Sequence, residues 1–220
     1  MAALASTAGG PRPFNDLVAE GEHGVVVTQE PHATAVGLEV LRRGGNAVDA
    51  AVAVALTLAV TFPQAGNLGG GGFLVFRRAD GEVFTIDFRE QAPASAARDM
   101  YLKPDGSVDV DKVQHGVTAA GVPGSPAGLL HALHRHGTRS LETLAAPAIR
   151  LAREGFVVDR KLAGSLWAKR EVLARYPSTR AVFFRDGAPL RQGDILVQKD
   201  LAATLQRFAE GGLAGFYDGR

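Results

Sequence analysis

The chain has 220 residues with a formal net charge of +1, and 46% of its residues are hydrophobic and 21% are charged. This balance is typical of a globular protein and argues against nucleic acid as a partner, because nucleic-acid-binding domains usually carry a concentrated basic patch. The absence of cysteine excludes disulfides, thiol catalysis and thiolate metal sites.

The start of the chain predicts a poorly defined segment, residues 1–24, followed by one domain that runs from residue 25 to residue 220. No internal repeat or low-complexity linker divides that domain. Residues Met1 to Asn15 lack the basic and apolar regions of a secretory signal. The sequence therefore favours a cytoplasmic location, with a missing leader as the alternative.

The domain is expected to open with a strand, Val25–Val27, and an amphipathic helix. Apolar residues then recur with helical spacing at Ala33, Val36, Gly37, Val40 and Leu41. The pair Gly44-Gly45 is a stop signal for that helix. This pattern predicts a helix that covers one face of a layer.

A second helix is predicted from Ala47 to Val60. Asn46 is a good N-cap, and Asp49 lies near the positive end of the helix dipole. The run is apolar on all sides but, at roughly 14 residues, it is shorter than the ~20 that cross a bilayer. We expect a buried core helix and no membrane span, with both helices on the same side of a sheet.

A tract of glycines, Gly69–Gly72, leads into a predicted hairpin. The strands are Phe73–Phe76 and Val83–Phe88, and Asp80-Gly81 supplies the turn. A nucleotide-binding loop is rejected, because its glycines must open a helix and no Lys-Ser or Lys-Thr follows these. The tract is therefore interpreted as a functional site or a tight crossing of the backbone.

Arg89 stands just after the second strand and has two interpretations. It could form a surface ion pair with Asp87 or Glu90, which would contribute under roughly 1 kcal/mol. Alternatively, its guanidinium could bind a carboxylate through two parallel hydrogen bonds. The residue alone does not decide between them.

Beyond residue 100 the sequence is mainly helical. Ser125-Pro126 and Ser140 are predicted helix starts, and Pro147 is expected to begin a helix that ends at Gly155. Further amphipathic helices are predicted around Leu162, Leu166 and Leu173, and around Leu201, Leu205, Phe208 and Ala209. A strand at residues 181–184 with the turn Asp186-Gly187 predicts a second, smaller hairpin.

Three histidines, His131, His134 and His136, are candidate metal ligands, because the first two are three residues apart on one predicted helix. Zinc sites usually need three or four ligands, and this helix contains no acidic or thiol partner. We therefore predict no metal and no other cofactor.

Several long motifs resemble the large subunit of gamma-glutamyltransferases (gamma-glutamyltranspeptidases). The motifs, in order, are GLEVLRRGGNAVDAAVAVALTLAVTFPQAGNLGGGGF, DFREQAPASAARDMYL, GVPGSPAGLLHALHRHGT, PAIRLAREGFVVD, GDILVQKDLAATLQ and FYDGR. The resemblance covers nearly everything from about Val25 to Arg220. It implies an α+β fold, part of the αββα sandwich of the N-terminal-nucleophile hydrolases, with a mostly helical C-terminal half.

The resemblance also implies a function and a missing partner. In that family a precursor cuts itself, and the threonine exposed at the start of a small subunit attacks a gamma-glutamyl amide such as glutathione. Its glutamyl group then passes to water, an amino acid or a peptide. The arginine of the DFRE-like motif, here Arg89, holds the alpha-carboxylate of that substrate. The nucleophile lies in the segment that would follow Arg220, so residues 25–220 form an incomplete domain with no catalytic residue of its own.

None of the chain's own threonines is expected to replace that nucleophile; those considered are Thr28, Thr57, Thr61 and Thr118. Three functions remain open. The chain is part of a gamma-glutamyltransferase-like enzyme, a stand-alone non-catalytic gamma-glutamyl-binding relative, or part of a related acylase whose substrate lacks the amino-acid carboxylate.

Overall fold

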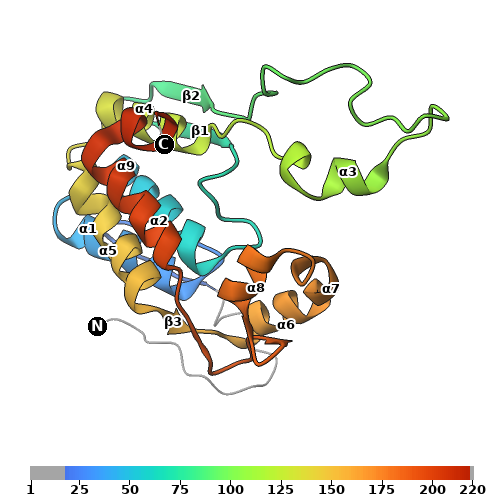
Figure 1. The fold of residues 1–220 in the computed structure, drawn as a ribbon. Coiled ribbons are helices and arrows are strands. Elements are labelled where there is room, and N and C mark those ends of the chain that lie inside the picture. Colours follow the sequence, from blue (N-terminus) through green and yellow to red (C-terminus); the bar gives the residue numbers. More distant parts are fainter. Residues whose placement is uncertain (1–17, 219–220) are drawn as a thin grey trace.

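The computed structural model describes residues 18–218 (Figure 1). Of the predicted N-terminal segment, residues 1–17 lie outside the described part, and residues 18–24 contain no helix or strand. The first half of the described chain contains α1 (Pro31–Arg42), α2 (Ala47–Thr61), β1 (Phe73–Arg77), β2 (Val83–Asp87), α3 (Val110–Gln114) and a 3₁₀ turn, η2 (Val117–Ala119).

The second half contains the larger number of helices and only very short strands. Its elements are α4 (Ser125–His136), α5 (Leu141–Glu154), β3 (Phe156–Val157), α6 (Arg160–Ala168), α7 (Arg170–Leu173), α8 (Pro177–Phe183), β4 (Phe184–Arg185), β5 (Ala188–Pro189), β6 (Ile195–Leu196) and α9 (Lys199–Tyr217).

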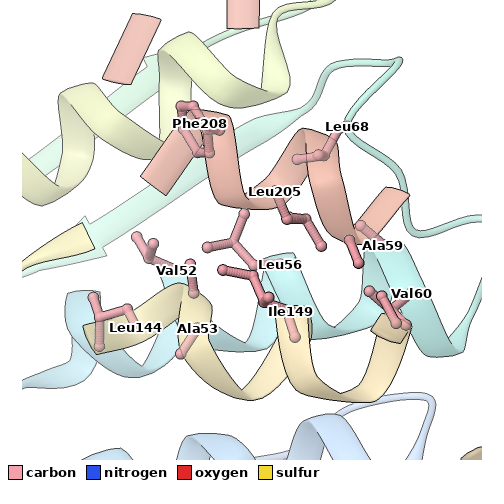
Figure 2. Packing of buried hydrophobic residues seen from close by; sticks show 14 of the residues in the cluster. Val52, Ala53, Leu56, Ala59, Val60, Leu68, Leu144, Ile149, Leu205 and Phe208 are labelled. Atoms are coloured by element: carbon pink, nitrogen blue, oxygen red, sulfur yellow. The ribbon is translucent and has the colours of Figure 1, made fainter. Parts of the chain in front are cut away.

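Helix α2 is the centre of the hydrophobic core, as its composition predicts. Helices α1, α4 and α5 pack against it, and Figure 2 shows side chains of α5 and α9 meeting those of α2. The fully buried members include Val52, Leu56, Leu144, Leu205 and Phe208. A helix that is apolar on every side has to be covered on every side, and these neighbours supply that cover.

The start of α2 is fixed by a capping box and by one buried carboxylate. The Asn46 side chain accepts hydrogen bonds from the backbone of Val48 and Asp49, at 2.9 and 3.0 Å. In return the backbone N–H of Asn46 donates to Asp49 Oδ2 at 2.8 Å. This confirms Asn46 as the N-cap.

Asp49 lies near the N-terminus of α2 and also accepts hydrogen bonds from the turn between α4 and α5. Its carboxylate accepts hydrogen bonds from Thr138 N at 2.8 Å, Thr138 Oγ1 at 2.6 Å and Arg139 N at 3.1 Å. Burial alone raises the pKa of Asp49, but these hydrogen bonds, together with that from Asn46, lower it below its ordinary value. The side chain is fully buried and joins parts of the chain 89 residues apart.

The predicted hairpin is confirmed as β1 and β2. The strands are antiparallel, with Phe73 opposite Asp87 and Arg77 opposite Val83. Gly81 in the turn has φ +94°, a conformation that side chains rarely adopt. Leu74, Phe76 and Ile86 pack toward the core, whereas the outward residues Phe73, Val75 and Val83 are exposed.

Some predicted elements are wrong, each for a local reason. Residues Val25–Val27 are not a strand, because no other segment of the described chain pairs with them, and the side chain of Val27 is largely exposed. Residues 181–183 belong to helix α8, which begins at Pro177. The turn at Asp186-Gly187 does form, but only Phe184–Arg185 and Ala188–Pro189 pair across it.

Two predicted helix starts are also displaced. Ser125 is the first residue of α4 and not its cap; Gly124 precedes it, and the N–H of Ser125 donates to the carbonyl of Gly70 at 2.9 Å, which replaces side-chain capping. Pro147 lies inside α5, because Ser140 caps that helix seven residues before Pro147. Gly155 follows the end of α5, as predicted.

The helix expected around Leu162, Leu166 and Leu173 is divided at Lys169 into α6 and α7. The helix expected around Leu201, Leu205 and Phe208 is confirmed as α9. Between β2 and α4 a long loop, residues 92–121, carries α3 and projects from the helical body (Figure 1).

The described chain is thus a mixed helix and strand structure, in agreement with the α+β prediction. Its sheets are three antiparallel pairs, β1-β2, β3-β6 and β4-β5, and residues 18–218 form no larger sheet. Across the same residues no helix has the length and hydrophobicity that a membrane span requires.

Candidate functional site

Arg89 follows the end of β2, and a sharp turn holds its backbone. The N–H of Arg89 donates to Asp87 Oδ1 at 3.0 Å, a local turn that aspartate commonly forms. One residue earlier, Phe88 continues the hairpin beyond β2 by pairing with Gly72: Phe88 N donates to Gly72 O at 3.0 Å, and Gly72 N donates to Phe88 O at 3.3 Å. The position of Arg89 is therefore set by the hairpin.

The glycine tract crosses this turn at close range. A Cβ atom on Gly71 would lie 2.7 Å from Arg89 Cα and 2.7 Å from Glu90 N, closer than real side chains approach. On Gly72 it would lie 3.0 Å from the ring of Phe88. The tight crossing expected of this tract is confirmed, and its partner is the backbone of Arg89 itself.

A second set of glycines closes on the same turn from the side of α4. A Cβ atom on Gly124 would lie 2.9 Å from Arg89 O, and one on Gly121 would lie 2.9 Å from the Cβ of Glu90. The ring of Phe88 lies directly against Gly128, where a side chain would have no space. Sequence reasoning missed these contacts; the spacing of glycines in GVPGSPAG was the available signal.

Backbone hydrogen bonds tie the two glycine sets to each other. The carbonyl of Gly70 accepts from Gly124 N at 2.8 Å and from Ser125 N at 2.9 Å. Gln91 and Val122 form an antiparallel bridge at the base of the projecting loop, residues 92–121. The turn that carries Arg89 is therefore enclosed between two segments that are about 50 residues apart in sequence.

The side chain of Arg89 extends outward and is 62% exposed. Its Nε donates to Glu90 Oε2 at 3.1 Å, and its Cζ lies 5.8 Å from the ring centroid of Phe73. A hydrogen bond from the backbone of Glu90 and one from Arg89 lower the pKa of the Glu90 carboxyl. The surface ion pair considered for Arg89 thus forms, with Glu90, and because both groups are exposed to solvent it adds little to stability.

Both terminal amino groups of Arg89, Nη1 and Nη2, have no hydrogen-bond partner among residues 18–218. Those two groups point in parallel from a planar guanidinium and match the two oxygens of a carboxylate. The pairing with Glu90 therefore leaves open the second interpretation of Arg89, because Glu90 engages only Nε.

A groove of about 470 Å³ lies between the end of β2 and α4, beside this turn. Its lining includes Phe88, Arg89, Gln91, Pro123 and His131. His131 and His134 are both exposed, and of the two His131 lines the groove. His136 lies near Phe76 and Phe84, with ring centroids 5.2 and 4.7 Å away. The structure thus separates the three histidines, and within residues 18–218 no group of three metal-binding side chains forms.

The hydroxyls of the threonines considered as nucleophiles make structural hydrogen bonds. Thr28 Oγ1 donates to Glu30 O at 2.7 Å and Thr57 Oγ1 donates to Ala53 O at 2.8 Å. Thr61 Oγ1 donates to the Glu30 carboxylate at 2.7 Å, and Thr118 Oγ1 donates to Lys112 O at 3.4 Å.

The C-terminal helix touches the same region. Tyr217 Oη donates to the carbonyl of Pro123 at 2.6 Å, directly before Gly124. Burial raises the pKa of the Tyr217 hydroxyl. The end of α9 therefore lies beside the candidate site, a contact over 94 residues that no local pattern predicted.

Comparison with known proteins gives consistent results. A family model described as gamma-glutamyltranspeptidase matches residues 33–220. The chain is 48% identical over 199 residues to a glutathione hydrolase proenzyme of Escherichia coli (strain K12), covering 90% of this chain and 34% of that protein. A solved gamma-glutamyltranspeptidase of Helicobacter pylori superposes with a TM-score of 0.89 at 42% identity, covering 92% of this chain and 58% of that one.

An acylase is also among the proteins to which the chain is similar. The chain is 39% identical over 209 residues to the acylase ACY 1 proenzyme of Pseudomonas sp. (strain V22), covering 92% of this chain and 37% of that protein. The chain spans about a third of the length of these curated relatives.

Proposed function

The chain belongs to the gamma-glutamyltranspeptidase family, and from that membership we propose that it is part of an enzyme acting on gamma-glutamyl amides such as glutathione. The enzyme hydrolyses the amide or transfers the gamma-glutamyl group to an amino acid or peptide, through an acyl-enzyme on a threonine. This chain supplies structural core and the binding site for the alpha-carboxylate. The nucleophile belongs to a separate part of the protein, a small subunit produced by self-cleavage.

The observation that carries this proposal is the position of Arg89. Two glycine sets pack closely against its backbone, while its terminal amino groups have no partner within residues 18–218. A closely packed backbone that presents two unpaired amino groups is suited to carboxylate recognition, because less conformational freedom is lost on binding.

The exposed outward face of the hairpin β1-β2 supports the proposal that another part of the enzyme packs against it. The side chains of Phe73, Val75 and Val83 are 65%, 72% and 55% exposed, and a two-stranded hairpin is marginally stable without further cover. We propose that the remaining part of the enzyme adds strands and covers this face, completing the αββα sandwich of an N-terminal-nucleophile hydrolase.

The experiment that tests the proposal is to detect the protein in its native source with an antibody against residues 1–220 and to analyse its subunits by mass spectrometry. The proposal predicts a second subunit that begins with threonine, and activity on a gamma-glutamyl anilide in the same fraction. A stable species at 23.0 kDa without a partner and without that activity would exclude it.

The second candidate is a related acylase, favoured by the identity to the acylase ACY 1 proenzyme. Such an enzyme would cleave a glutaryl or similar amide whose acyl group lacks the alpha-carboxylate. Purified enzyme assayed with gamma-glutamyl and glutaryl anilides side by side distinguishes the two, since Arg89 assists only a donor that carries that carboxylate.

A further inference from the structure

Phe73 is an exposed aromatic residue at the start of β1. Its neighbours Leu74 and Phe76 pack against the hydrophobic core, but the side chain of Phe73 points to the opposite face and is 65% exposed. It lies opposite Asp87 in the hairpin, two residues before Arg89. A large aromatic side chain in this position contributes little to the core of the described chain.

The ring of Phe73 lies close to the guanidinium of Arg89. The Cζ atom of Arg89 lies 5.8 Å from the ring centroid, within the range at which a cation is attracted to the negative face of an aromatic ring. Arginine is well suited to this contact, because its guanidinium is planar and weakly hydrated.

Phe73 and Glu90 restrict Arg89 in different ways. Glu90 Oε2 accepts a hydrogen bond from Nε at 3.1 Å, which fixes one edge of the guanidinium. The ring of Phe73 attracts the cation without using any of its N–H donors. The end of the guanidinium, Nη1 and Nη2, is left without a partner in residues 18–218.

A carboxylate that binds across Nη1 and Nη2 makes two parallel hydrogen bonds. We propose that Phe73 is a positioning residue for Arg89, whose ring holds the guanidinium with these two groups directed at the alpha-carboxylate of the donor substrate. This inference rests on the proposed function and adds to it the orientation of the arginine and the residue that maintains it.

Phe73 restricts the orientation of the Arg89 guanidinium and does not change its charge. An arginine side chain has several rotatable bonds, and holding it in one orientation before the substrate arrives reduces the entropy lost on binding. A carboxylate side chain in place of Phe73 would compete for the amino groups, whereas a ring does not. A leucine would fill part of the same space but has no ring to attract the cation.

The test uses the complete, processed enzyme and compares Phe73→Leu with Phe73→Tyr. The first removes the aromatic ring, and the second keeps it. We expect Phe73→Leu to raise KM for a gamma-glutamyl anilide by about two- to fivefold with kcat little changed, and Phe73→Tyr to retain the original KM. Phe73→Met is the second ring-free variant, should Phe73→Leu fail to mature.

Val75→Ala is the matched control, because Val75 is the next outward residue of β1 and is 72% exposed. It removes apolar surface from the same face without contacting Arg89, so any effect should be on the yield of processed enzyme and not on KM. A purely structural role of Phe73 would instead lower the yield of processed enzyme and kcat, and Phe73→Tyr would not specifically restore KM.

A double-mutant cycle completes the test. In an Arg89→Ala background, Phe73→Leu should have no further effect on KM, because the group that it positions is gone. The inference is wrong if Phe73→Leu matches Val75→Ala, if Phe73→Tyr is as impaired as Phe73→Leu, or if the effect persists without Arg89. If Arg89→Ala itself leaves the kinetics unchanged, the proposed function of Arg89 fails as well. If Arg89→Ala raises KM but Phe73→Leu does not, only the role of Phe73 is overturned.

Discussion

At the scale of single residues, Arg89 carries the function that we propose. Arg89→Lys keeps the positive charge but loses the parallel pair of amino groups, and Arg89→Ala loses both. In the complete enzyme we expect kcat/KM for a gamma-glutamyl anilide to fall by about 10²-fold or more, equivalent to a few kcal/mol, if the contact with the carboxylate is desolvated. Steady-state kinetics on purified variants measures this.

The control for Arg89 is Arg98→Lys, since the side chain of Arg98 is 96% exposed and lies in the projecting loop, residues 92–121. Its kinetics should match those of the original enzyme. Unchanged kinetics in the Arg89 variants would remove Arg89 from the substrate site.

Asp49 is a residue on which stability depends. Asp49→Asn replaces one carboxylate oxygen, which accepts hydrogen bonds, by an amide group, which donates them. At this fully buried position the new amide would face donors such as Asn46 N and Thr138 Oγ1. We expect it to lower the free energy of unfolding by about 2–4 kcal/mol. Asp200→Asn, in the exposed first turn of α9, should cost less than about 1 kcal/mol. Urea unfolding of both variants gives the comparison.

The pKa of Asp49 also predicts how this stability depends on pH. Because the folded state lowers that pKa, the stabilisation is fully present above the ordinary carboxyl value of about 3.9 and is lost as pH falls through the lower folded value. The difference in unfolding free energy between the original protein and Asp49→Asn should therefore be constant near neutral pH and shrink in acid. A difference that grows on acidification would contradict this account.

Local signals explain which residues the sequence could identify. Asn46 was recognisable as a cap because capping depends on the next three residues. The hydrogen bond from Thr138 to Asp49 joins residues 89 positions apart, and the contact of Phe73 with Arg89 depends on strand pairing. Neither contact has a signature in neighbouring residues, so both had to be seen in the structure.

At the scale of elements, helix α2 and the hairpin β1-β2 were predictable because each is specified by its own composition. The strand expected at Val25–Val27 was not formed, since a strand also requires a partner and none is present among the described residues. The segment that includes Val182 and Phe183 has strand-forming residues, yet Pro177 starts a helix there. Helix starts and tertiary partners therefore outweighed the strand propensity of individual residues.

The close packing of the glycine tract against the turn that carries Arg89 can be tested by the substitution Gly71→Ala, which adds one methyl group. Gly71→Ala places a Cβ where the backbone of Arg89 and Glu90 already lies, so we expect the turn to shift. The expected result is a loss of about 1–3 kcal/mol in stability and a raised KM for the gamma-glutamyl donor.

Gly164→Ala in helix α6 is the matched control for Gly71→Ala. A Cβ on Gly164 would have no atom within 4 Å, and alanine favours a helix over glycine by about 1 kcal/mol. The control should therefore be neutral or stabilising. Equal stability and equal kinetics for the two variants would show that the crossing does not constrain Arg89.

At the scale of the whole molecule, the exposed outward face of the hairpin predicts that residues 1–220 are not self-sufficient. Expressed alone, the chain should bind a hydrophobic dye and self-associate, and the double variant Val75→Thr, Val83→Thr should reduce both effects. Light scattering and dye fluorescence provide the measurement. A monodisperse 23.0 kDa protein without dye binding would contradict the expectation that this face is covered by further protein.

Gln198, at the entrance to α9, donates a buried hydrogen bond through Nε2 to the carbonyl of Val60 at 2.8 Å, across 138 positions of sequence. The central helix therefore meets α9 only after a further 138 residues have been synthesised. Contacts of such high order slow folding, and the nascent chain exposes the apolar surface of α2 in the meantime. Until α9 emerges from the ribosome, the nascent chain should accordingly be more prone to aggregation than the finished fold.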